Sequence, residues 1–178
     1  MMEIPQPAMV LNSHDVPGAE YKMTNTWKVP ENTTPQHMLG WCAQVFKDFK
    51  TKHPNSTTTL IINCHGDVTA GNRGGYGLLI GTGIKLGTVS EFEKIAPHCD
   101  QIIITACQAA RITSAGGDGD GNLLMSGIAK AAQAYVTCST ADQTIAWTPW
   151  LPFGYIDDWE GTVLTYGPEG NVVAVENH

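Results

Sequence analysis

The chain has 178 residues with 10 basic and 17 acidic side chains, a net charge of −7, and a charged fraction of only 15%. This length fits one domain, residues 1–178, that can bury a core without disulfides or a structural metal. The acidic balance excludes nucleic acid and anionic membrane as expected partners, because both bind clustered lysine and arginine. No apolar run is long enough to span a bilayer, and the first residues lack the basic and apolar regions of a signal peptide. We therefore expect a cytoplasmic protein, with export by a signal-independent route left open.

The first 34 residues are rich in proline, asparagine and threonine, and we interpret them as an irregular arm with one short strand near Ala8–Leu11. A helix is predicted to begin at Thr34 and Pro35, since threonine caps helices and proline at the first helical position loses no hydrogen bond. Apolar side chains then recur at helical spacing as far as Phe49, and His53 with Pro54 ends the helix.

Two β-branched apolar runs, Thr58–Cys64 and Gln101–Ala106, are typical of central strands buried on both faces. Strands and helices alternate along the rest of the chain, which predicts an α/β fold with three layers and a mostly parallel central sheet flanked by helices. The remaining predicted elements are a strand at Leu78–Ile80, a helix through Phe92 and Ile95, a helix from Asn122 to Gln133, a strand at Ala134–Cys138 and a C-terminal hairpin over Gly161–Val175.

Both central strands end in residues that can carry chemistry. His65 and Gly66 follow the first strand, and Cys107 follows the second. If the strands are parallel neighbours, these residues leave the same edge of the sheet and face each other. A histidine can then take the proton of the thiol, while the glycine lets a backbone N–H approach a substrate carbonyl.

This pattern resembles the caspase-like cysteine peptidases, which include caspases, legumains, clostripains and the self-processing domains of bacterial toxins. The similarity covers Thr58–Thr140, and the segment Thr105–Ala110 with the glycine-rich loop after it is similar to the bacterial CHAT-type branch. The resemblance implies a caspase-like fold and a cysteine endopeptidase that acts on peptide or protein substrates without a cofactor. It implies Cys107 as the nucleophile and His65 as its partner, with the backbone N–H groups of Gly66 and Cys107 stabilising the oxyanion.

The residues around the cysteine depart from the caspases themselves, which carry Gln-Ala-Cys before an arginine and a glycine. Here Thr105 and Ala106 precede Cys107, and Gln108 and Ala109 follow it, so aspartate specificity is not implied. An acidic side chain in the cleft would instead select a basic substrate residue, because a charge in a pocket needs a counter-charge. The candidates, among which the sequence does not choose, are Asp67, Asp142, Asp157 and Asp158, together with Arg73 for a substrate carboxylate.

Metal sites are weakly indicated. Asp118, Asp120 and Asn122 have the alternate spacing of the first ligands in a calcium loop, but the twelfth position is Ala129 instead of glutamate, which excludes an EF-hand. A looser Ca²⁺ site stays open, and we favour a helix cap at Asp120 or Asn122. The adjacent cysteine and histidine pairs lack the spacing of structural zinc sites.

The five cysteines are dispersed without a C-x-x-C pair, which indicates free thiols in a reducing compartment. Two alternatives to the peptidase stay open: a catalytically silent or regulatory module with the same fold, and a flavodoxin-like domain that binds a small ligand. The short chain also leaves room for an activating protein partner, and the oligomeric state is not predicted.

Overall fold

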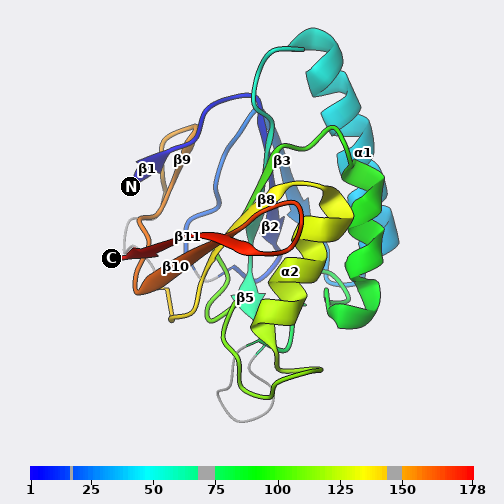
Figure 1. Cartoon of the computed structure of the whole chain (residues 1–178). Coiled ribbons are helices and arrows are strands. Elements are labelled where there is room, and N and C mark those ends of the chain that lie inside the picture. The colour runs from blue at the N-terminus through cyan, green and yellow to red at the C-terminus, as the bar shows by residue number, and fades with distance from the viewer. Residues whose placement is uncertain (17, 68–74, 144–149) are drawn as a thin grey trace.

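The computed structural model describes residues 1–16, 18–67, 75–143 and 150–178. Within them the main feature is a seven-stranded sheet in the order β11-β10-β8-β7-β4-β2-β3 (Figure 1). Its strands are β2 (Ala8–Ser13), β3 (Asn25–Val29), β4 (Thr59–Asn63), β7 (Gln101–Ile104), β8 (Tyr135–Ser139), β10 (Thr162–Tyr166) and β11 (Val172–Asn177).

The α/β class and the three layers are confirmed, and the C-terminal hairpin is β10 with β11. The strands from β3 to β8 pair in parallel. The sheet as a whole is mixed rather than mostly parallel, because β10 pairs antiparallel with both β8 and β11.

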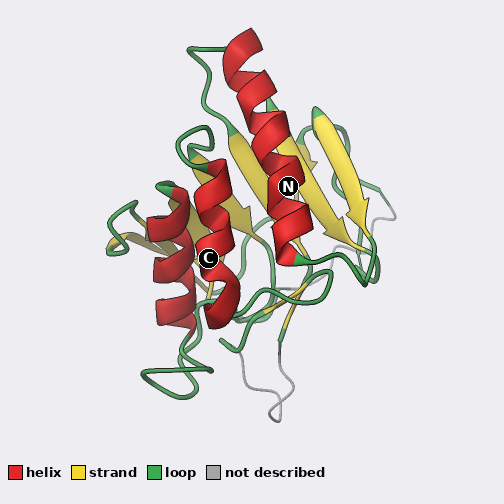
Figure 2. Ribbon diagram, turned by 90° about the vertical axis from the view of Figure 1, so that its right-hand side faces the viewer, coloured by secondary structure: helices red, strands yellow, loops and turns green. Residues whose placement is uncertain are grey.

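Three helices cover one face of the sheet (Figure 2). They are α1 (Pro35–Lys52), the 3₁₀-helix η1 (Leu86–Ile95) and α2 (Gly121–Ala132). The predicted start of α1 is confirmed, since the Thr34 hydroxyl accepts the N–H of His37 at 3.2 Å. In α2 the Asp120 carboxylate accepts the N–H of Leu123 at 3.1 Å, which confirms the favoured helix cap.

In the described part of the chain, irregular segments instead of helices cover the opposite face. Ile61 of β4 and Ile103 of β7 point to this face, where they pack on Ile4, Tyr21 and other side chains of irregular segments. A small ribbon of β1 (Met2–Glu3) with β9 (Tyr155–Ile156) belongs to the same layer. Because both faces of the central strands are covered, their sequences read as continuous apolar runs.

The first 34 residues contribute more to the sheet than the sequence predicts. The expected strand at Ala8–Leu11 is present and extends to Ser13 as β2, between β4 and β3. Strand β3 was not predicted, because it lies at the sheet edge and its polar Asn25, Thr26 and Lys28 make no apolar run. None of the helices in the described part of the chain is long and apolar enough to cross a membrane.

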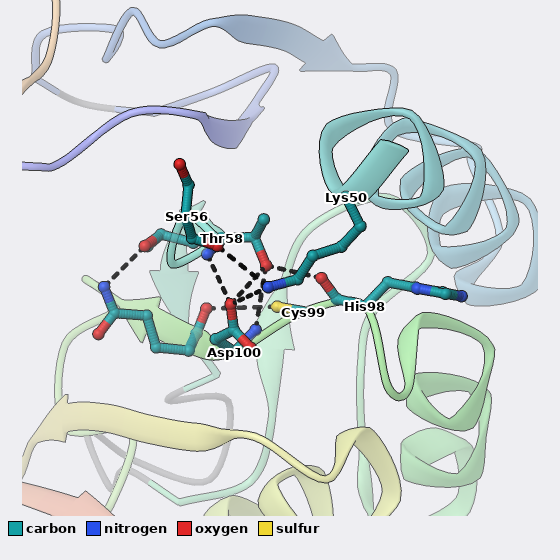
Figure 3. Close-up of polar contacts among 8 residues, drawn as sticks. Lys50, Ser56, Thr58, His98, Cys99 and Asp100 are labelled. Atoms are coloured by element: carbon teal, nitrogen blue, oxygen red, sulfur yellow. Dashed lines mark hydrogen bonds and ion pairs between the residues drawn. The ribbon is translucent and has the colours of Figure 1, made fainter. Parts of the chain in front are cut away.

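A polar cluster joins α1 to the amino ends of β4 and β7 (Figure 3). The Lys50 ammonium donates to Asp100 Oδ2 at 2.6 Å and to the carbonyl of Ser56 at 3.1 Å. The same carboxylate oxygen accepts the backbone N–H of Thr58 at 2.8 Å. Partial burial opposes ionisation of Asp100, but the bonds from Lys50 and Thr58 outweigh it and hold the pKa of this carboxyl below its usual range.

We expect Asp100→Asn to lower the free energy of unfolding by about 1 kcal/mol near neutral pH, since the lost charged hydrogen bonds are partly screened by solvent. A carboxyl whose folded pKa lies below its unfolded value stabilises above the unfolded pKa, and loses this effect as pH falls through the folded pKa. The difference in free energy of unfolding between variant and wild type should therefore disappear below about pH 4, as urea unfolding at a series of pH values would show. Asp48→Asn, which removes an exposed carboxylate paired only with Lys52 along α1, is the control. A gap independent of pH would contradict this account.

Candidate active site

The carboxyl ends of β4 and β7 meet at one edge of the sheet. These strands pair in parallel with Ile62 opposite Ile104. His65 lies three residues beyond Ile62 and Cys107 three residues beyond Ile104, so the two follow at equivalent positions. Both side chains line one cavity, as the sequence predicts for parallel neighbours.

Gly66 packs directly against the backbone of Cys107. A Cβ atom on Gly66 would lie 2.0 Å from the Cys107 carbonyl oxygen, so only glycine permits this approach. Strand β5 (His65–Gly66) pairs antiparallel with β6 (Leu78–Leu79), and the next N–H, that of Asp67, donates to the carbonyl of Gly77 at 2.8 Å. Hydrogen bonding alternates along such a ladder, so the N–H of Gly66 points away from β6.

The ring of His65 is oriented by a backbone carbonyl. Its Nε2 lies 3.2 Å from the carbonyl oxygen of Asp15. A carbonyl only accepts hydrogen bonds, so Nε2 carries the proton and the lone pair of the neutral ring resides on Nδ1. Asp15 itself accepts the hydroxyl of Ser13, and chiefly this bond, with His14 and His65 nearby, holds the pKa of the Asp15 carboxyl below its usual range.

Cys107 differs from the other cysteines in exposure. Its Sγ accepts the backbone N–H of Gln143 at 3.4 Å, and it is half-buried. The other four are buried, and burial raises the pKa of the Cys99 thiol to about 12 and that of the remaining three as well. Cys64 is in the core as predicted, although it also contributes to the wall of the cavity. Cys107 is thus the thiol that a reagent or substrate can reach.

The turn that follows Cys107 is held in a left-handed conformation. Gln108 has a φ of 52°, a region that residues other than glycine rarely adopt. Its N–H donates to the carbonyl of Ala141 at 2.9 Å, and its side-chain amide donates to Asp142 at 2.7 Å. Arg111 donates to the side-chain oxygen of Gln108 at 2.9 Å. These bonds anchor the turn to the segment after β8, so Asp142 supports the turn and does not line the cavity.

The remaining acidic candidates separate into two groups. Asp67 is buried, pairs with Lys85 at 3.7 Å and does not line the cavity. Asp157 and Asp158 do line it. Arg73 lies outside the described residues.

The cavity has a volume of about 160 Å³ and opens to solvent. Most of its wall was not predicted, because it comes from irregular segments without periodicity. Gln143, next to the candidate Asp142, could have been found by extending the strand-end argument to β8. The residues that matter most for its chemistry are Tyr21, His65, Cys107, Gln143, Asp157 and Trp159.

The loop considered for calcium serves the helix that follows it. Asp120 caps α2, Asn122 accepts the hydroxyl of Tyr166 at 3.0 Å, and Asp118 is exposed. Within the described ranges no group of three or more histidine, cysteine, aspartate or glutamate side chains is placed to hold a metal ion. Nothing in this part of the structure therefore supports the looser Ca²⁺ site or a zinc site.

Comparison of the chain with protein-family models, with curated proteins and with solved structures finds no match. The resemblance to the caspase-like peptidases therefore stays a prediction that depends on the two strand ends.

We expect Gly66→Ala to destabilise the fold by about 3 kcal/mol, because the added methyl group forces the backbones of β5 and Cys107 apart. Chemical unfolding would measure this loss. Gly40→Ala is the matched control, since among the described residues no atom beyond its neighbours and the backbone of α1 lies within 4 Å of a Cβ at that position. It should stabilise by about 1 kcal/mol through helix propensity. Equal stability of Gly66→Ala and wild type would show that the close approach is absent.

Proposed function

We propose that the chain is a cysteine endopeptidase in which Cys107 is the nucleophile and His65 is its general base. The observation that carries the proposal is the placement of both side chains at equivalent positions beyond two paired strands, lining one cavity. A thiol and an imidazole at one cleft form the pair that activates cysteine for acyl transfer.

The proposed steps are those of acyl transfer to a thiol. The proton of the Cys107 thiol passes to Nδ1 of His65, and the sulfur attacks the carbonyl carbon of the scissile peptide. The backbone N–H groups of Gly66 and Cys107 stabilise the resulting oxyanion. Collapse breaks the C–N bond, and His65 returns its proton to the leaving amine. Water then attacks the thioester with His65 as base, which releases the acid and restores the thiol.

Further observations support the compartment and the class of ligand. All five cysteines are free, which is consistent with a reducing compartment such as the cytoplasm. A cavity of about 160 Å³ is close in volume to an interior cavity that binds benzene. It therefore suits one amino-acid side chain better than a flavin or dinucleotide, so the flavodoxin-like alternative gains no support.

One observation favours the catalytically silent alternative. The sulfur of Cys107 contacts the backbone N–H and carbonyl of Gln143, while the Nε2 of His65 contacts Asp15. A module that only binds peptides would keep these contacts, because it needs no proton transfer between Cys107 and His65. The experiment on the dyad distinguishes the two functions.

We expect Cys107→Ala to abolish cleavage of a peptide library, and His65→Asn to lower kcat/KM by about 100- to 10,000-fold through loss of general-base catalysis. Mass spectrometry of the products, together with the intact mass of the protein, would detect substrate cleavage and self-cleavage. Limited iodoacetamide should place a single adduct on Cys107 and remove activity in parallel.

Cys138→Ala is the control, since this buried thiol lies in the core and away from the cavity. It should keep its activity per folded molecule. Cleavage that survives in Cys107→Ala would contradict the proposal, and absence of cleavage in the wild type across the library would favour the silent module.

A further inference from the structure

We propose that the cavity beside Cys107 receives a lysine or arginine side chain of the substrate, and that Asp157 is the carboxylate that selects it. The inference rests on the proposed function, because it assigns the residue whose carbonyl Cys107 attacks. It also makes a claim about binding of a cation that can be tested without catalysis.

The charge of the cavity points to a cation. Its lining contains the carboxylates of Asp157 and Asp158, and no lysine or arginine among the residues that the structure describes. His65 is the only basic side chain in that described lining, and it is engaged with the carbonyl of Asp15. An acidic substrate side chain would meet like charge here, whereas a basic one would supply the missing counter-charge.

A hydrogen bond from Tyr21 orients the Asp157 carboxylate to bind such a cation. It is half-buried, and its Oδ2 accepts the hydroxyl of Tyr21 at 2.9 Å. Burial, and then the neighbouring Asp157, raise the pKa of Tyr21, so the hydroxyl stays protonated and keeps donating. This bond fixes one carboxylate oxygen, and the structure gives Oδ1 no partner within the described ranges. An ammonium or guanidinium group can therefore bind there through a charge-assisted hydrogen bond.

The rest of the wall suits the aliphatic part of a long basic side chain. Trp159, Val16 and Ala19 line the same cavity as Asp157 and contribute apolar surface to it. Lysine and arginine bury their methylene groups against such surface while the charged end reaches a polar partner. Asp158 is a weaker candidate, because its side chain is 73% exposed and pairs with the amino group of Met1. Solvent screens a charge at that exposure.

The first test uses peptidyl acyloxymethyl ketones that differ only in the residue before the reactive group. We expect arginine and lysine probes to label Cys107 about 30-fold faster than norleucine or glutamine probes, as a charge-assisted hydrogen bond predicts, with the aspartate probe slowest. Asp157→Asn keeps an acceptor for Tyr21 and should reduce this preference to about 3-fold. Asp48→Asn removes the same charge from the outer face of α1 and should leave the preference unchanged.

The second test measures binding of butylguanidinium and of neutral butylurea to Cys107→Ala by calorimetry. The cation should bind more tightly, and Asp157→Asn in the same background should remove the difference. Two outcomes would overturn the inference. In the first, norleucine or aspartate probes label Cys107 faster than the arginine probe. In the second, Asp158→Asn removes the preference for basic probes while Asp157→Asn keeps it. A third outcome is that the cation binds through Asp157 while no probe labels Cys107 faster than it labels the unfolded chain. That result would support the cation-binding pocket and contradict the proposed peptidase activity.

Discussion

The parallel pairing of β4 with β7 is the constraint on which the candidate site depends. Ile62 opposite Ile104 brings His65 and Cys107 to the same level of the sheet edge, and Gly66 then allows the two backbones to touch. A slip of one residue would move Ile61 and its neighbours to the wrong faces, so burial on both sides fixes the register. At the other end of the same strands, the Asp100 carboxylate ties both to α1.

The cavity is formed both by the sheet and by the layer of irregular segments opposite the helices. The sheet supplies the histidine and the cysteine, but Tyr21 and the segment Asp157–Trp159 come from the irregular segments on the face opposite α1, η1 and α2. Gln143 joins the two parts, because its backbone contacts the Cys107 sulfur and its side chain donates to the carbonyl of Glu160 at 3.0 Å. Gln143 thus links Cys107 to the segment that directly follows Trp159.

Elements with a strong local pattern could be predicted from the sequence, and contacts between distant segments could not. The isoleucine runs of β4 and β7, the cap at Thr34 and the strand-end residues His65 and Cys107 all follow from short-range rules. Strand β3 lacks such a pattern because its edge position tolerates polar residues. The four acidic candidates looked equivalent in the sequence. Their surroundings in the fold distinguish them. Asp67 pairs with Lys85 and Asp142 accepts a hydrogen bond from Gln108, whereas Asp157 and Asp158 line the cavity.

One of the two contacts of Cys107, that with the N–H of Gln143, is also compatible with the proposed dyad. An N–H that donates to sulfur stabilises a thiolate more than a neutral thiol, because the bond is then charge-assisted. The contact with the Gln143 N–H would therefore persist, and strengthen, once the proton has left, whereas the contact with the Gln143 carbonyl would be lost. Similarly, the bond from Nε2 of His65 to Asp15 fixes the tautomer whose Nδ1 can take that proton. Within the described residues Nδ1 of His65 has no hydrogen-bond partner, so the proposed proton transfer requires Nδ1 and the sulfur to approach each other when a substrate occupies the cavity.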